Sequence, residues 1–176
     1  GELLRVLHYG DSQIEQDRIT STLRGNWQSR FGGMGCGLVP ALQPVQTPYM
    51  KQDYSGDLQR YLVYGLESDR ASHKHYGPMA QFGRVEDSAR VILTPRHYRQ
   101  PPFRNQASQI RVLVSNYQPG FQAVLHVGDA YLSKTLPDSS AVLQVLTWQL
   151  EEPVSVVDLS FWGHADIQAI ALDGAS

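Results

Sequence analysis

The chain has 176 residues and a mass of 19.7 kDa, with 15 basic and 17 acidic residues and a formal net charge of -2. This length is enough for one domain with a real core, or for one domain and part of another. The basic residues are scattered, which excludes an obvious nucleic-acid footprint, and no run approaches the roughly 18 apolar residues of a membrane-spanning helix. We therefore expect neither a nucleic-acid partner nor membrane insertion. The single cysteine, Cys36, excludes an internal disulfide and is most simply a buried small residue.

The first 33 residues predict a strand, a tight turn and a helix. Residues 3–9 form a short, mostly apolar run that is typical of a buried strand. Gly10-Asp11-Ser12 follows, and the period then changes. Apolar residues recur at intervals of four, at Ile19, Leu23, Trp27 and Phe31. This spacing predicts an amphipathic helix with one apolar stripe, and Gly32-Gly33 is typical of the residues just past a helix.

The remainder of the chain predicts a connector and then an all-β region. Residues 33–57 contain closely spaced glycines and prolines, so we expect neither a helix nor a long strand there. Beyond them, short runs rich in valine, leucine, isoleucine and tryptophan alternate with turn signals. The candidate strands are residues 89–94, 109–115, 121–127, 142–149, 154–162 and 167–172. Several short strands at this spacing predict an antiparallel β-sandwich or jelly roll.

Ser12 allows two interpretations. A serine at a strand-to-helix turn exposes its hydroxyl at the edge of the sheet, where backbone N–H groups at the helix start can stabilise an oxyanion. Alternatively, Ser12 caps the helix, with Glu15 three residues later completing a capping box. The spacing alone leaves both interpretations open.

The sequence around Ser12 resembles that of a known family. Gly-Asp-Ser directly after an apolar run, in Val-Leu-His-Tyr-Gly-Asp-Ser-Gln, resembles the first signature block of the SGNH (GDSL-type) hydrolases, whose serine is the nucleophile. The run Asp-Ser-Gln-Ile-Glu-Gln-Asp-Arg-Ile-Thr-Ser-Thr-Leu-Arg, followed by Arg-Phe-Gly-Gly-Met-Gly-Cys-Gly-Leu, looks like a bacterial branch of this family that includes carbohydrate and peptidoglycan O-acetylesterases. In that branch a β-sandwich resembling a carbohydrate-binding module is inserted after the first strand and helix. The resemblance is specific over residues 4–42.

The resemblance implies roles for three residues and a division of the chain. Ser12 would be the nucleophile, with its own backbone N–H as one oxyanion donor, and Gly10 and Asp11 would support the turn. Residues 1–42 would be a strand-turn-helix segment of an α/β hydrolase core, 43–57 a connector, and 58–176 the inserted sandwich. The fold class expected is therefore α/β plus all-β. No metal or organic cofactor is implied, and a glycan substrate would place the protein in the periplasm or outside the cell.

The rest of the family's catalytic machinery is not found in this sequence. The family takes its base from an Asp-x-x-His element, and none of the six histidines has an aspartate three positions earlier. These histidines are His8, His73, His75, His97, His126 and His164. A serine without its base is a poor nucleophile, so we expect this portion of an esterase to be inactive or nearly so. The chain ends at Ser176, about where an inserted sandwich would return to the hydrolase core.

Two pairs of polar residues invite other interpretations. His73 and His75 would share one side of a strand, a spacing that metal sites use. No third ligand is apparent nearby, so the alternative interpretation is that both histidines lie in a solvated loop. His164 and Asp166 could pair as a catalytic dyad, although a turn carrying surface polar groups explains them as well.

The aromatic residues of the β region suggest a second function, a non-catalytic carbohydrate-binding or interaction module. Tyr98 and Tyr117 lie near turns, so we expect them to be exposed and treat them as candidate glycan contacts. Trp148 and Trp162 lie in apolar strands, so we expect them inside. Residues 3–9, without sheet partners, predict either self-association through that strand or docking onto the sandwich.

Overall fold

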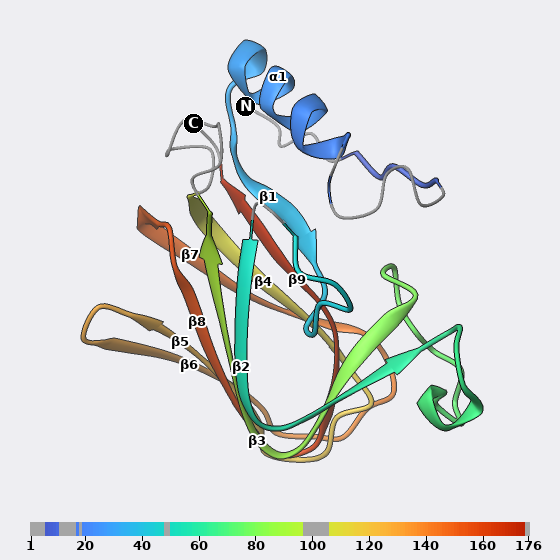
Figure 1. Cartoon of the computed structure of the whole chain (residues 1–176). Coiled ribbons are helices and arrows are strands. Elements are labelled where there is room, and N and C mark those ends of the chain that lie inside the picture. The colour runs from blue at the N-terminus through green and yellow to red at the C-terminus, as the bar shows by residue number, and fades with distance from the viewer. Residues whose placement is uncertain (1–5, 11–16, 18, 48–49, 97–105, 175–176) are drawn as a thin grey trace.

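A computed structural model describes residues 6–10, 17, 19–47, 50–96 and 106–174. Within them the chain forms one α-helix, one short 3-10 turn and nine strands (Figure 1). The helix is α1 (Thr20–Phe31) and the 3-10 turn is η2 (Glu67–Asp69). The strands are β1 (Met34–Val39), β2 (Met50–Leu62), β3 (Gln81–Pro95), β4 (Ala107–Ser115), β5 (Phe121–Val127), β6 (Ala130–Leu136), β7 (Gln144–Val154), β8 (Val157–Trp162) and β9 (Ala165–Gly174). No helix among these residues is both long enough and apolar enough to cross a membrane.

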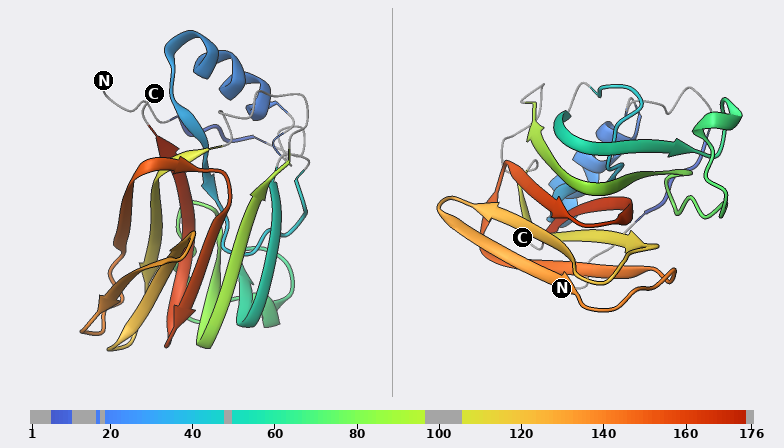
Figure 2. Two further views of the ribbon diagram at one scale, coloured as in Figure 1. Left: turned by 90° about the vertical axis from the view of Figure 1, so that its left-hand side faces the viewer. Right: turned by 90° about the horizontal axis from the view of Figure 1, so that it is seen from below.

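The nine strands form one antiparallel sheet that folds over on itself into two layers (Figure 2). The strand order is β6-β5-β8-β3-β9-β4-β7, with β2 paired to β3 and β1 paired to β9. Strand β3 joins the layers, because residues 88–93 pair with β8 and residues 83–85 pair with β9. One layer is therefore β6-β5-β8-β3-β2, and the other is β1-β9-β4-β7.

The hydrophobic core lies between the two layers. Leu93, Leu125 and Phe161 are fully buried on the first layer, and Ile110 and Ile167 are fully buried on the second. In β8 the odd-numbered residues face this core while the even-numbered ones face outward, as the alternation of a strand requires. The predicted antiparallel sandwich is confirmed, and each of the six predicted strands overlaps a strand of the structure.

Three strands lie where no strand was expected. Strands β1 and β2 occupy residues 34–39 and 50–62, much of the range predicted to be a connector. That prediction was wrong because glycine can sit in a β-bulge without ending the strand. In β2 the register shifts between Gly56 and Leu58, and Gly56 has φ +85. Strand β6 follows β5 through a two-residue turn, since Val127 pairs with Ala130.

The predicted buried strand at the N-terminus is not formed in the part that the structure describes. Residues 6–9 carry no regular structure, and Val6, Leu7 and Tyr9 are exposed. An apolar run becomes a buried strand only where neighbouring strands cover it, and the nine strands described here are arranged without it. Strand-edge self-association therefore has no strand to act through at residues 6–9. The helix is confirmed, and Gly32 ends it with φ +79, as the Gly-Gly pair predicted.

Candidate functional site

The serine segment lies almost entirely outside the described residues. Asp11 and Ser12 are not described, and Gly10 is exposed and carries no regular structure. The N-cap of α1 is Ile19, so Ser12 does not cap this helix and the capping-box interpretation is wrong for α1. The roles of Gly10, Asp11 and Ser12 therefore stay predictions.

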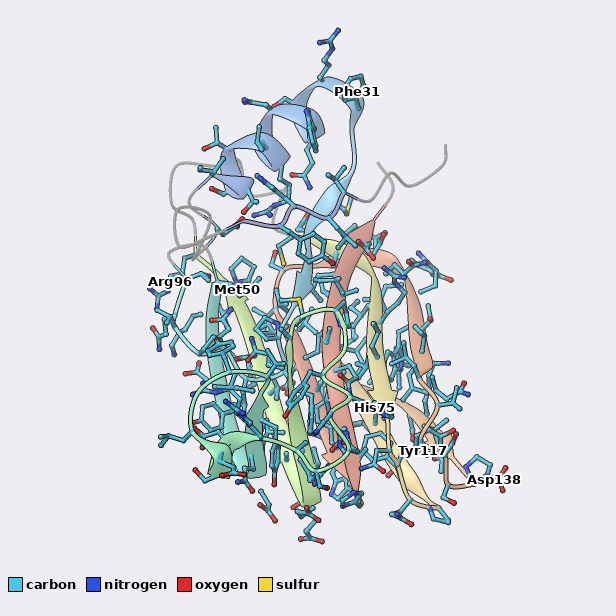
Figure 3. The ribbon with its side chains drawn as sticks, turned by 90° about the vertical axis from the view of Figure 1, so that its right-hand side faces the viewer. Phe31, Met50, His75, Arg96, Tyr117 and Asp138 are labelled. Carbon is cyan, nitrogen blue, oxygen red and sulfur yellow. The ribbon has the colours of Figure 1, made fainter. Side chains whose placement is uncertain are left out.

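The helix that follows exposes the side that was expected to be buried. The four residues of the apolar stripe, Ile19, Leu23, Trp27 and Phe31, are exposed at 43%, 36%, 43% and 71%. Ser21 and Gly25, on the opposite side, are the buried residues of α1. The amide of Gln28 fastens the helix to β1 by donating to the carbonyl oxygen of Gly35 at 2.8 Å. Figure 3 shows Phe31 at the outer end of α1, away from the strands.

A polar network surrounds Asp166 of β9, where the segment between β2 and β3 contacts the strand. Its carboxylate is fully buried and accepts two hydrogen bonds from the Arg84 guanidinium, Nε to Oδ1 at 2.6 Å and Nη2 to Oδ2 at 2.9 Å. His73 Nε2 lies 2.9 Å from Oδ2, and the Asn116 amide donates to the same oxygen at 3.1 Å. The bond with Asp166 raises the pKa of Arg84 above its ordinary value. Four donors on one carboxylate explain how a charge can be buried here.

The protonation of His73 follows from its two neighbours. The backbone N–H of His75 donates to His73 Nδ1 at 3.0 Å, so Nδ1 carries no proton. The remaining nitrogen, Nε2, then carries the proton and donates it to Asp166. Neither ring nitrogen keeps a free lone pair, so His73 is not placed to act as a general base. The network holds the segment between β2 and β3 against β9 instead.

For the two polar pairs the structure favours the loop and turn interpretations, because His73 and His75 lie in the loop between β2 and β3 and His164 lies in the turn between β8 and β9. His164 does not pair with Asp166, because its Nδ1 lies 2.8 Å from Oε2 of Glu86. Asp166 is buried rather than a surface group. His73 stacks on Phe82 at 5.3 Å and has its second nitrogen committed to Asp166, so it does not face a ligand together with His75. Among the described residues no group of three histidine, cysteine or acidic side chains is placed to hold a metal ion.

Two aromatic residues, Tyr117 and Trp162, differ in exposure from what the sequence predicted. Tyr117 is only 6% exposed, so its expected exposure was wrong, and Tyr98 lies outside the described residues. Tyr117 is buried because it belongs to the main hydrophobic core, and its backbone forms a bridge to Ser140. Trp148 is buried, as expected, whereas Trp162 is 43% exposed and its predicted core position was wrong. The signal for Trp162 was in the sequence, because it continues the alternation of Asp158 and Ser160 rather than that of Leu159 and Phe161.

Trp162 belongs to the outward face of the five-stranded layer. Across the strands, Trp162 lies between Ser88 of β3 and Gln122 of β5, and Ser160 lies beside Arg90 of β3. Arg90 in turn pairs with Ser55 of β2. We call this surface the outer face, defined by Ser55, Ser88, Arg90, Gln122, His126, Tyr131, Asp158, Ser160 and Trp162.

A shallow hollow lies on the outer face beside Trp162. It has a volume of about 180 Å³ and lies over the bulge of β2. Its lining is Ser55, Gly56, Ser88, Ala89, Arg90, Ser160 and Trp162. The lining thus combines one indole ring, one guanidinium and three hydroxyl groups.

Charged and polar side chains on the outer face hold each other in place. Arg90 donates to Asp158 through Nε at 2.8 Å and through Nη2 at 2.6 Å, a paired contact that lowers the pKa of the Asp158 carboxyl. His126 Nε2 lies 2.9 Å from the hydroxyl of Ser160, and the His126 ring meets Tyr131 edge-on at 4.9 Å. The outer face therefore presents oriented donors and acceptors next to exposed rings.

Comparisons with known proteins agree with the fold. No family model and no curated protein matches the chain. Among solved structures, a peptidoglycan O-acetylesterase superposes with a TM-score of 0.56 at 16% identity, over 94% of this chain and 41% of that one. The chain thus spans about two fifths of the length of that esterase. At this identity the likeness shows a shared fold.

Carbohydrate-binding modules are also among the similar structures. One from Clostridium stercorarium, in complex with cellobiose, gives a TM-score of 0.45 at 13% identity, over 79% of this chain and 93% of that one. A module in complex with β-1,4-galactotriose gives 0.37 at 13% identity, over 70% and 84%. The class that the fold defines is an antiparallel β-sandwich.

Proposed function

We propose that this chain is a portion of an SGNH-type serine esterase that removes O-acyl groups, O-acetyl in particular, from a glycan. Ser12 is the nucleophile in this proposal, Gly10 and Asp11 support its turn, and the sandwich holds the glycan. The base and the remaining oxyanion donors come from other parts of the protein. A glycan substrate of this kind places the enzyme in the periplasm or outside the cell.

The exposed apolar stripe of α1 carries the proposal. A helix that follows a Gly-Asp-Ser turn in a hydrolase core packs its apolar side on a sheet. Here Trp27 and Phe31 stay exposed while Ser21 and Gly25 are buried, so the stripe has nothing to cover it among the described residues. A contiguous exposed apolar surface marks an interaction site, and a hydrolase sheet is the partner that the preceding sequence favours.

The sequence supports a base located elsewhere, because none of the six histidines has an aspartate three positions earlier, as the family's element requires. Two histidines of the sandwich have an acidic partner, His73 with Asp166 and His164 with Glu86, while His126 bonds to Ser160. In Figure 3, His75 lies toward the end of the sandwich opposite α1. A triad requires a histidine within hydrogen-bond reach of the serine and an acid that orients it.

The test is hydrolysis of a small aryl acetate by the complete gene product and by the 176-residue chain, each beside its Ser12→Ala variant. We expect the complete product to lose at least 10³-fold in kcat on substitution, because the members of a triad act as a unit. We expect the 176-residue chain and its variant to be equally inactive. Serine-independent turnover by the complete product rejects Ser12 as nucleophile, and serine-dependent turnover by the 176-residue chain rejects a base located elsewhere.

The second candidate function is glycan binding without catalysis. The outer face favours it, because an exposed tryptophan beside a paired arginine and aspartate needs no catalytic partner to bind a sugar. Serine-dependent hydrolysis separates the two candidates, because only an esterase shows activity that Ser12→Ala abolishes, whereas glycan binding should survive the change under either candidate.

A further inference from the structure

The hollow beside Trp162 combines an apolar ring surface with hydroxyl groups, which complements the apolar faces and polar edges of a sugar ring. The indole is 43% exposed, which leaves a flat apolar surface available to a ligand. The hydroxyls of Ser55 and Ser88 line the same hollow, and each can both donate and accept a hydrogen bond. Gly56 forms part of the lining and has no side chain, so the approach from β2 stays open. A flat ring with apolar faces and polar edges fits such a surface.

The arginine–aspartate pair at this hollow favours hydroxyl groups over anions. Arg90 uses Nε and Nη2 for Asp158, so among the hydrogen bonds formed by the described residues its Nη1 is not engaged. Each carboxylate oxygen of Asp158 has a second lone pair beyond the bond to Arg90. A sugar can accept from Nη1 with one hydroxyl and donate to the carboxylate with another, whereas an anion can only accept. The pair therefore suits a ligand rich in hydroxyls.

The charge and polarity of the outer face disfavour other classes of partner. Arg90 is balanced by Asp158, and nearby on β2 Lys51 is balanced by Asp53 at 2.6 Å. Nucleic acids bind through unbalanced positive charge, which this surface does not offer. The positions opposite Ser160 and Asp158 carry two aliphatic residues, Val124 and Ile92. Val124 is 7% exposed and Ile92 is partly buried, so the surface lacks the broad exposed apolar centre of a protein interface.

We infer that the outer face binds an uncharged, hydroxyl-rich oligosaccharide, with Trp162 under one sugar ring and the Arg90–Asp158 pair reading its hydroxyls. This inference rests on the proposed glycan role of the sandwich. Tyr131, exposed at 71%, lies two strands away and four residues further along the register. Strand spacing and rise place it about 16 Å from Trp162. A single ring does not span that distance, so the ligand extends across the strands from Trp162 towards Tyr131.

The experiment is titration of the ¹⁵N-labelled chain with three tetrasaccharides, namely cellotetraose, N-acetylchitotetraose and the acidic tetragalacturonate. The three tryptophans give one indole N–H signal each, and Trp162→Ala identifies the signal of Trp162. We expect an uncharged tetrasaccharide to shift this signal and to bind at least tenfold more weakly to Trp162→Ala and Arg90→Gln. Tyr64→Ala is the matched control, because Tyr64 is an exposed aromatic residue outside the outer face. Binding to Tyr64→Ala and to Ser12→Ala should equal that of the original chain.

Each other result rejects a named part of the inference. Binding that survives Trp162→Ala rejects the outer face as the site while the glycan role of the sandwich stands. Tighter binding of tetragalacturonate than of both uncharged sugars rejects the ligand chemistry. Absence of binding to all three sugars rejects the site and the glycan role together, and leaves the Ser12 assay as the remaining test of the esterase.

Discussion

Replacing Asp166 by asparagine should destabilise the protein strongly, because it removes the charge that Arg84 is buried against. Asparagine keeps the size of the side chain but leaves the guanidinium, whose side chain is only 16% exposed, without a counter-charge. Breaking a buried ion pair in this way costs about 3–5 kcal/mol of unfolding free energy. Since Arg84 retains some contact with water, we expect about 3 kcal/mol, which corresponds to a fall in Tm of roughly 6–12 °C for a chain of this size.

The matched control is Asp158→Asn, which breaks an arginine–aspartate pair of the same kind whose arginine, Arg90, lies on the same strand as Arg84. Arg90 is half exposed, with 50% of its side chain accessible, so water replaces the lost partner. An exposed pair contributes about 0–1 kcal/mol, and the control should stay within that range. Urea unfolding followed by circular dichroism measures both variants against the original chain, with the slope of the transition checking that the unfolded state is unchanged.

A double variant tests the physical reason for the difference. The Arg84 guanidinium lies over the rings of Tyr61 and Phe82, at 4.9 Å and 5.5 Å from their centroids. Methionine at position 84 keeps much of this packing and carries no charge, so Arg84→Met should recover part of the loss in the Asp166→Asn background. Equal losses for Asp158→Asn and Asp166→Asn, or a double variant less stable than Asp166→Asn alone, would refute the argument.

Three further predictions follow from single residues. Burial raises the pKa of the Cys36 thiol to about 11, so at pH 8 it should react with a disulfide reagent about 100-fold more slowly than a thiol of ordinary pKa, and at the ordinary rate once unfolded. Gly56→Ala should cost at least about 1 kcal/mol more than Gly120→Ala in urea unfolding, because both glycines have similar positive φ, +85 and +83, but only at Gly56 would the added Cβ overlap the backbone of β3. Equal costs would contradict this reason. Because hydrogen bonds from its arginine partner lower the pKa of Asp158 in the folded state, its contribution is present above the unfolded pKa and is lost as the pH falls through the folded one. Asp158→Asn and the original chain should therefore converge in stability below about pH 4, and a difference that persists at pH 2 would contradict the assignment.

The sandwich could be predicted because its strands are short, apolar and separated by turns, which is a local property of the sequence. Two of the three strands that escaped prediction, β1 and β2, are strands whose pattern glycine interrupts. In β2 the bulge at Gly56 breaks the alternation, and in β1 Gly35 and Gly37 both adopt positive φ. The pairing partner, rather than the local composition, makes these segments strands.

The candidate site was less accessible from sequence because it depends on which face of a strand meets water. Trp162 has an apolar neighbour in Phe161, and composition alone suggested burial, yet its register beside Ser88 and Gln122 sets it on the outer face. Three partners of Asp166 lie 50, 82 and 93 residues away in the chain, at Asn116, Arg84 and His73. Local spacing in the sequence does not predict such a network, because only the fold brings its members together.

The pairing of β1 with β9 brings the beginning and the end of the sandwich to the same place. Met34 lies opposite Gly174, and Val39 lies opposite Ile170. Paired residues on neighbouring strands are about 5 Å apart, so the chain enters and leaves the sandwich through adjacent positions. A domain with this geometry fits into a surface loop of another domain without forcing the two ends of that loop apart. Because α1 immediately precedes β1, any residues that continue beyond β9 in a longer protein would start beside the helix and its uncovered apolar stripe.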